Sequence, residues 1–422
     1  MQNETIAVHG GYNKKEGYGS MSVPIAQTTA YAFRDSEHAA NLFALKELGP
    51  IYTRLTNPTT DVLEQRFAQL EGGAAAICVA SGQSAIFYAI ANVAQAGENI
   101  LISDKLYGGA VTLLTHTIKR FGITAKVFRS EDASDLEEQI DNKTKAIFFE
   151  SLSNPQIAIA DIEKIVEIAK RKSVLTICDN TVASAALFNP IKWGVDVVVH
   201  STSKYTNGQG TTIGGIIVER DGLADFFKAN ASKYTEFTEP DASYHGLVYT
   251  DVPLPNFCLR VRLALLRDIG AAQSPHNSWL LLQTIETLAL RVDRHSDNAL
   301  EVAKFLESNA KVKSVNYPGL ESNPEYTKAQ KYFKDGKASG LISFEVESYE
   351  AAKAVIDSAK LFSVVVNIGD SKSLIVHPAS TTHSQMNEQE LASAGINATT
   401  VRLSIGLENP VDLIEDLNQA LN

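Results

Sequence analysis

The chain has 422 residues, of which 44% are hydrophobic and 21% charged, a composition typical of a soluble globular protein with about two or three packed units. The formal net charge of −11 argues against nucleic acid or an anionic membrane as the main partner. No apolar leader opens the chain and no stretch approaches about 18 consecutive apolar residues, so neither a secretory signal nor a membrane span is predicted. Three cysteines without metal-ligand spacing indicate reduced thiols in a cytoplasmic protein, and no metal site.

From residue 74 onward the sequence alternates between apolar runs and helical patterns. The runs that predict strands cover 74–80, 99–104, 123–128, 145–151, 174–179 and 196–201. Helices are predicted over 82–96, 108–122 and 161–172. Near-continuous apolar strands alternating with helices indicate an α/β fold with a buried, mostly parallel sheet. The run at 214–220 follows so soon after the previous strand that we expect it to be antiparallel.

The segments around this alternation define the expected domains. Residues 1–55 read as an irregular N-terminal arm, 56–270 as a large domain, and 271–422 as a smaller C-terminal α+β domain. A long helix over about 279–308 is expected to lead into the C-terminal region. The polar, aromatic stretch at about 231–255 is predicted to be a functional loop, because structureless segments of that length are uncommon.

The strongest local signal is HSTSKYTNGQG at 200–210, where Lys204 lies just beyond a predicted strand. Ligands of open α/β sheets bind at the carboxyl ends of the strands. A lysine there can form a Schiff base with a carbonyl, and Ser201 and Ser203 can donate hydrogen bonds to a phosphate. The alternative, a solvated loop lysine, becomes less attractive once the neighbouring strand ends are considered.

Two other strands also end in polar residues. Asp179, in CDNT, follows an apolar run, where an acid is costly unless it meets a cation such as a protonated pyridine nitrogen. Asn154, in ESLSNPQ, has an amide that can bond a phenolic oxygen of the same ligand. Each also has a simpler explanation, a helix N-cap for Asp179 and a turn before Pro155 for Asn154.

Further candidates lie at helix starts and outside the sheet. In ASGQSAI, the N–H groups of Gly82 and Gln83 would open a helix whose positive end favours an anion, although an ordinary strand–helix turn has the same pattern. In LYGG, the ring of Tyr107 could stack on a pyridine face or simply pack. Arg402 is a charged residue within a strand of alternating pattern, where it could bind a substrate carboxylate or form an interdomain salt bridge.

Together these segments resemble the Cys/Met-metabolism family of enzymes that depend on pyridoxal 5'-phosphate (PLP). The resemblance covers nearly the whole chain and rests on an ordered set of motifs: YTRLTNPT, SGQSAI, LYGG, SNP, CDNT, HSTSKYTNGQG, HPAS and VRLSIGLE. It implies the PLP-dependent transferase fold type I, similar to aspartate aminotransferase, with an arm, a large PLP domain and a small C-terminal domain. It also implies a dimer, usually paired into a homotetramer, whose sites are shared between subunits.

The resemblance also implies roles for individual residues. Lys204 would hold PLP covalently and, with Tyr107 and Tyr52, move protons during catalysis. The other cofactor contacts would be Asp179 at the ring nitrogen, Tyr107 on the ring, Asn154 at the phenolic oxygen, Gly82, Gln83, Ser201 and Ser203 at the phosphate, and Tyr52 and Arg54 at the phosphate of the neighbouring subunit. Arg402 and Asn367 would bind the amino-acid substrate.

Within the family, SGQSA and FTEPDASYHGLVY look like O-acetylhomoserine sulfhydrylase. The expected reaction is γ-replacement on an activated homoserine ester by sulfide or a thiol, with a sulfur-carrier protein as a further candidate donor. Cystathionine γ-synthase and the γ-lyases are alternatives, although Gly109 stands where methionine γ-lyases usually carry cysteine, and Val182 replaces a usual aromatic residue. A nucleotide-binding dehydrogenase lacks support because no GxGxxG follows a strand, and the presence of Lys204, Asp179 and Arg402 argues against a non-catalytic scaffold.

Overall fold

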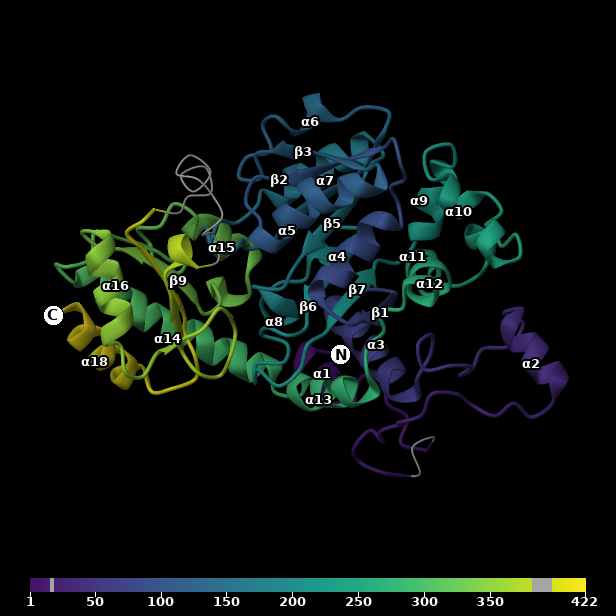
Figure 1. Ribbon diagram of the computed structural model, residues 1–422, viewed down its shortest axis with the longest axis horizontal. Coiled ribbons are helices and arrows are strands. Elements are labelled where there is room, and N and C mark those ends of the chain that lie inside the picture. The colour runs from purple at the N-terminus through teal and green to yellow at the C-terminus, as the bar shows by residue number, and fades with distance from the viewer. Residues whose placement is uncertain (16–18, 382–396) are drawn as a thin grey trace. The chain divides into compact units, whose positions relative to one another are not determined.

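The computed structural model (Figure 1) describes residues 1–15, 19–381 and 397–422. These residues divide into two compact units. The first unit comprises residues 1–93, 196–203 and 211–286, and the second comprises residues 94–195, 204–210 and 287–422. The domain boundaries expected at residues 55 and 270 remain predictions. Within the described residues, no helix combines the length and the apolar character needed to cross a membrane.

In the first unit, strands and helices alternate along only part of the chain. In chain order they are α1 (Asn3–His9), α2 (Ser36–Phe43), α3 (Pro58–Glu71), β1 (Ala75–Val79), α4 (Gly82–Ala91), β6 (Val197–Ser201), β7 (Gly215–Glu219), α9 (Leu223–Ala229), α10 (Thr235–Thr238), η4 (Ala242–Tyr244), η5 (Tyr249–Asp251), α11 (Asn256–Arg260), η6 (Val261–Leu266), α12 (Arg267–Ile269) and α13 (Pro275–Ile285).

The second unit contains the remaining strands and the C-terminal region. Its elements are β2 (Asn99–Ser103), α5 (Gly108–Thr112), η1 (Leu113–Thr117), η2 (Ile118–Phe121), β3 (Thr124–Phe128), α6 (Leu136–Gln139), β4 (Thr144–Glu150), α7 (Ile162–Arg171), β5 (Leu175–Asp179), α8 (Ser184–Leu187), η3 (Pro190–Trp193), α14 (Leu288–Ser308), β8 (Ser314–Asn316), α15 (Tyr326–Tyr332), η7 (Lys334–Gly336), β9 (Leu341–Glu345), α16 (Tyr349–Ser358), β10 (Ser363–Val364), β11 (Leu374–Val376), η8 (Pro378–Ser380), β12 (Thr400–Ser404) and α18 (Pro410–Leu421).

The predicted sheet is present, with seven strands in the order β1-β7-β6-β5-β4-β2-β3. Strand β4 is parallel to β2 and β5, and β2 is parallel to β3, whereas β7 is antiparallel to both β1 and β6. All residues of β2 and β4 are buried, which explains their continuous apolar sequence. The expectation of an antiparallel strand at 214–220 is confirmed.

Local sequence signals account for several helix ends. Helix α3 has Pro58 in its first turn, and the side chain of Asn57 accepts hydrogen bonds from the N–H groups of Thr59 and Thr60. The helix ends at Gly72, whose φ of 75° lies in the left-handed region. Helix α7 begins after Asp161, whose side chain accepts from the N–H of Lys164. These caps make the boundaries readable from sequence.

The C-terminal region of the second unit has its own sheet and core. Its five strands follow the order β10-β11-β12-β9-β8, and helices α14, α16 and α18 lie beside them (Figure 1). Buried side chains of these elements, including Val302, Phe344, Leu403 and Leu417, form one apolar cluster. The helices and strands of this region thus pack around one shared core, which confirms the expected α+β character.

Two predicted segments differ from the structure. The helix expected over 279–308 is two helices, α13 and α14, separated at Glu286 and Thr287. Near the end of α13 the hydroxyl of Thr284 donates to the carbonyl of Leu281, three residues back, and such local side-chain bonds compete with the helical backbone. The stretch at 231–255 is not structureless, because it contains α10, η4 and η5.

Candidate active site

The second unit brings four predicted site residues together. The Nζ of Lys204 donates to Oδ1 of Asn367 at 2.6 Å. One guanidinium nitrogen of Arg402 donates to Oδ1 of Asn154 at 2.9 Å, and another donates to the backbone carbonyl of Asn367 at 3.2 Å. Asn367 therefore links the lysine amine to the arginine, although the four residues come from distant parts of the sequence.

Burial changes the ionisation of both basic groups in this cluster. Desolvation, and then the charge of Arg402, lower the pKa of Lys204 below its ordinary value. Desolvation lowers the pKa of Arg402 to about 10, so its guanidinium stays charged at neutral pH. Within the described residues, the buried Nε of Arg402 has no hydrogen-bond partner. A buried cation with an unused donor is suited to binding an anion.

Two carboxyl groups end neighbouring parallel strands. Glu150 closes β4 and Asp179 closes β5, and the two residues are paired in register. Oδ1 of Asp179 accepts from the N–H of Thr181 at 2.9 Å, so the residue also caps the turn that follows its strand. Burial, and then repulsion from Asp179, raise the pKa of Glu150 well above its usual range. The strand ends thus form an acidic edge in the second unit.

The first unit contains the predicted phosphate segment. Helix α4 begins at Gly82, and the side chain of Ser81 accepts from the N–H of Ser84. A Cβ on Gly82 would lie only 2.5 Å from the Cβ of Ser201, so glycine is required where α4 meets the end of β6. The hydroxyl of Ser203 contacts both backbone groups of Gly214, at 3.1 and 3.3 Å. Gln83 lies in the first turn of α4.

Three predicted aromatic and basic residues are exposed. Tyr107, the N-cap of α5 in the second unit, is 45% exposed. Tyr52 and Arg54, both exposed in the first unit, contact each other, with the guanidinium carbon 5.1 Å from the ring centroid. Their exposure leaves Tyr107 able to stack on a ligand and leaves Tyr52 and Arg54 accessible to another subunit.

Two buried residues of the second unit were not anticipated. Glu150 contacts the backbone of two site residues, and the apolar run that it ends gives it the same sequence signal as Asp179. Arg291 of α14 donates to the carbonyls of Tyr205 and Thr206 at 2.8 and 3.1 Å, immediately after Lys204. A Cβ on Gly208 would lie 1.9 Å from that guanidinium. A lone arginine in an amphipathic helix carries no sequence signal for such a contact.

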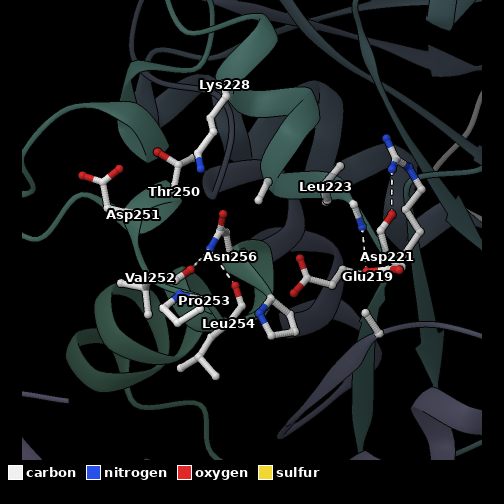
Figure 2. Close-up of a pocket in the computed structure, with 15 residues that line it drawn as sticks. Glu219, Asp221, Leu223, Lys228, Thr250, Asp251, Val252, Pro253, Leu254 and Asn256 are labelled. Atoms are coloured by element: carbon white, nitrogen blue, oxygen red, sulfur yellow. Dashed lines mark hydrogen bonds between the residues drawn. The ribbon is translucent and has the colours of Figure 1, made fainter. Parts of the chain in front are cut away.

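The first unit also contains a cavity of about 400 Å³ with none of the predicted site residues in its lining (Figure 2). Glu219, at the end of β7, lies in this lining and accepts from the N–H of Phe257 at 2.8 Å. The amide of Asn256 donates to the carbonyls of Val252 and Leu254, which folds the preceding turn around it (Figure 2). These contacts anchor the start of α11.

Comparisons with known proteins agree on the family. The family model described as Cys/Met metabolism PLP-dependent enzyme matches residues 4–422. The O-acetyl-L-homoserine sulfhydrylase of Leptospira meyeri is 47% identical, covering 99% of this chain and 96% of its own. The homocysteine synthase of Schizosaccharomyces pombe is 43% identical, covering 99% of this chain and 97% of its own.

Solved structures extend the comparison to the fold. A Campylobacter jejuni protein described as an O-acetylhomoserine (thiol)-lyase, which carries N'-pyridoxyl-lysine-5'-monophosphate, superposes with a TM-score of 0.98 at 56% identity and full coverage of both chains. A cystathionine γ-lyase of Lactobacillus plantarum reaches a TM-score of 0.84 at 30% identity, covering 100% of this chain and 98% of its own. These similarities confirm the expected fold type I. The chain belongs to the Cys/Met-metabolism family of PLP-dependent enzymes.

Proposed function

We propose that this enzyme catalyses γ-replacement on O-acetyl-L-homoserine, with sulfide as the acceptor and homocysteine and acetate as the products. The observation that carries the proposal is the contact of Lys204 with Asn367 and of Asn367 with Arg402, which joins a base to an anion-binding group. The names of the Leptospira meyeri and Schizosaccharomyces pombe relatives support the choice of substrate and product.

The residues present fit PLP. When bound, PLP supplies an electron sink that stabilises negative charge on the substrate carbons. Lys204 offers a partly desolvated amine for covalent attachment, and Asp179 offers a carboxylate for the ring nitrogen. At the start of α4, the N–H groups of Gly82 and Gln83 would bind the phosphate, together with the side chains of Ser201 and Ser203. Tyr107 would stack on the ring, and Asn154 would contact the phenolic oxygen.

The chain's own groups would then hold the substrate and move its protons. Arg402 holds the α-carboxylate, because its guanidinium is buried and charged and has an unused donor. Lys204, whose pKa is lowered, would take the proton from the α-carbon and release it within the site, and, as a free amine again, would take one from the β-carbon, which permits loss of acetate from the γ-carbon. Sulfide adds at that carbon, and Lys204 returns the protons. Tyr107 and Tyr52 would assist these transfers.

The test is product analysis on the purified holoenzyme. With O-acetyl-L-homoserine, we expect homocysteine only when sulfide is added and little keto acid in its absence. O-Succinyl- and O-phospho-homoserine identify the acyl group, while cysteine, methanethiol and a sulfur-carrier protein identify the donor. Rapid keto-acid release without an acceptor would instead assign a γ-lyase, and cystathionine formation from cysteine would assign a cystathionine γ-synthase.

We further propose that the enzyme acts in the cytoplasm as a dimer of dimers. Cys78, Cys178 and Cys258 form no disulfide and are buried, as in proteins of reducing compartments. The exposed pair Tyr52 and Arg54 is accessible to a neighbouring subunit, whose phosphate site it would complete. Light scattering of the holoenzyme tests the assembly, and a monomer would contradict it.

A further inference from the structure

Glu150 is a buried carboxyl group without a role in the reaction described above. It is 6% exposed and ends β4 beside Asp179 of β5. Its Oε1 accepts from the N–H of Tyr107 at 2.6 Å, and its Oε2 accepts from the N–H of Asn154 at 3.1 Å. Each oxygen thus holds the backbone of a different candidate site residue.

The two contacts hold residues with different proposed roles. Tyr107 is the N-cap of α5, so its N–H anchors the residue that carries the exposed ring. Asn154 carries the amide oxygen that accepts from Arg402 at 2.9 Å. A displacement of the Asn154 backbone would therefore be transmitted to the guanidinium that is proposed to hold the substrate carboxylate.

We propose that Glu150 is a positioning residue that fixes the Tyr107 ring for the cofactor and the Asn154–Arg402 pair for the substrate carboxylate. The two N–H groups are bound by different oxygens, so the contact pair uses both acceptors of the carboxyl group. Glutamine retains one acceptor and turns a donor toward the other N–H, so it preserves one contact at most. The inference rests on the proposed function, but its tests measure cofactor and amino-acid binding.

The decisive variant is Glu150→Gln, which keeps the size of the side chain, with Glu150→Ala beside it. The matched control is Asp416→Asn in α18, because Asp416 is likewise buried and accepts from the backbone N–H groups of Lys360 and Leu361. We expect Glu150→Gln to alter the visible circular dichroism of bound PLP. Its affinity for a non-reacting amino acid should fall about tenfold, the scale of a lost buried hydrogen bond.

The control should lose thermal stability and keep the wild-type dichroism and amino-acid affinity. KM should rise in Glu150→Gln more than kcat falls, because the substrate carboxylate contact is disturbed. If the spectrum and amino-acid affinity of Glu150→Gln match wild type while its melting temperature falls as in the control, Glu150 is merely structural and the inference is wrong. Absence of γ-replacement in a wild-type enzyme that binds PLP would contradict the proposed function alone.

Discussion

At the scale of single residues, the candidate site depends on basic groups whose ionisation is set by burial. Lys204 contacts Asn367, and its pKa is lowered first by desolvation and then by Arg402. A lysine with a lowered pKa exists as a free amine at a lower pH than an exposed lysine does. This property is needed both for Schiff-base formation and for proton removal.

Lys204→Ala should abolish turnover and leave PLP bound only non-covalently, because no other group in the cluster is a primary amine. Borohydride reduction of the wild-type holoenzyme should fix the cofactor to one peptide, identified by mass spectrometry. A labelled peptide that lacks Lys204 would disprove the assignment.

Asp179→Asn should retain PLP but slow removal of the α-proton by orders of magnitude, because a neutral amide would not keep the ring nitrogen protonated. Its cap on the N–H of Thr181 can be preserved by the asparagine oxygen, so folding should survive. The measurement is exchange of the α-proton with deuterated solvent. Near-normal exchange would leave Asp179 with only its capping role.

At the scale of elements, buried carboxyl groups at strand ends accept hydrogen bonds from backbone N–H groups at helix starts. Glu219 ends β7 and accepts from the first turn of α11, and burial raises its pKa to about 8 from an ordinary value of 4.5. The folded protein therefore retains a proton between these pH values that the unfolded chain releases. Stability from this group is complete below pH 4.5 and is lost as the pH rises to about 8.

Glu219→Gln should remove this dependence. The free energy of unfolding of the variant minus that of wild type should be larger at pH 9 than at pH 5 by several kcal/mol, since each pKa unit corresponds to about 1.4 kcal/mol. Denaturant unfolding at both pH values measures the difference. Glu415→Gln, at an exposed position, is the control and should show almost no gain. An equal gain in both variants would refute the assignment to Glu219.

At the scale of the whole molecule, we propose that a second subunit completes the active site. Tyr52 and Arg54 are exposed and stacked on each other in the first unit, as expected of a pair that contacts a partner's phosphate. An active site shared in this way makes activity depend on assembly.

Arg54→Ala and Lys204→Ala, each inactive or nearly so, should regain activity when their subunits are mixed and reassembled, because one hybrid site receives both intact residues. Arg54→Ala alone should lose roughly 1.5–3 kcal/mol of PLP affinity and recover partly at high cofactor concentration. Activity and PLP content of verified mixed oligomers measure both effects. Mixed oligomers without activity would place Arg54 outside the neighbouring site.

The sequence by itself determined the class of fold and the candidate residues at its strand ends. Apolar runs, caps such as Asn57 and Asp161, and the motifs around Asp179 and Lys204 are local signals, so they can be read without coordinates. The seven strands follow from the same periodicity, and the antiparallel direction of β7 follows from the short connection that precedes it.

Only the tertiary structure decided how these residues contact one another. Lys204 contacts Asn367, and Arg402 contacts Asn154, although both pairs lie far apart in the chain. No periodic pattern in the sequence indicates such contacts. The two contacts of Glu150 and the contacts of Arg291 with the carbonyls after Lys204 likewise depend on packing between distant segments. The physical reason is that burial, which shifts pKa values and makes each unused donor costly, is a property of the assembled core and not of any local stretch of sequence.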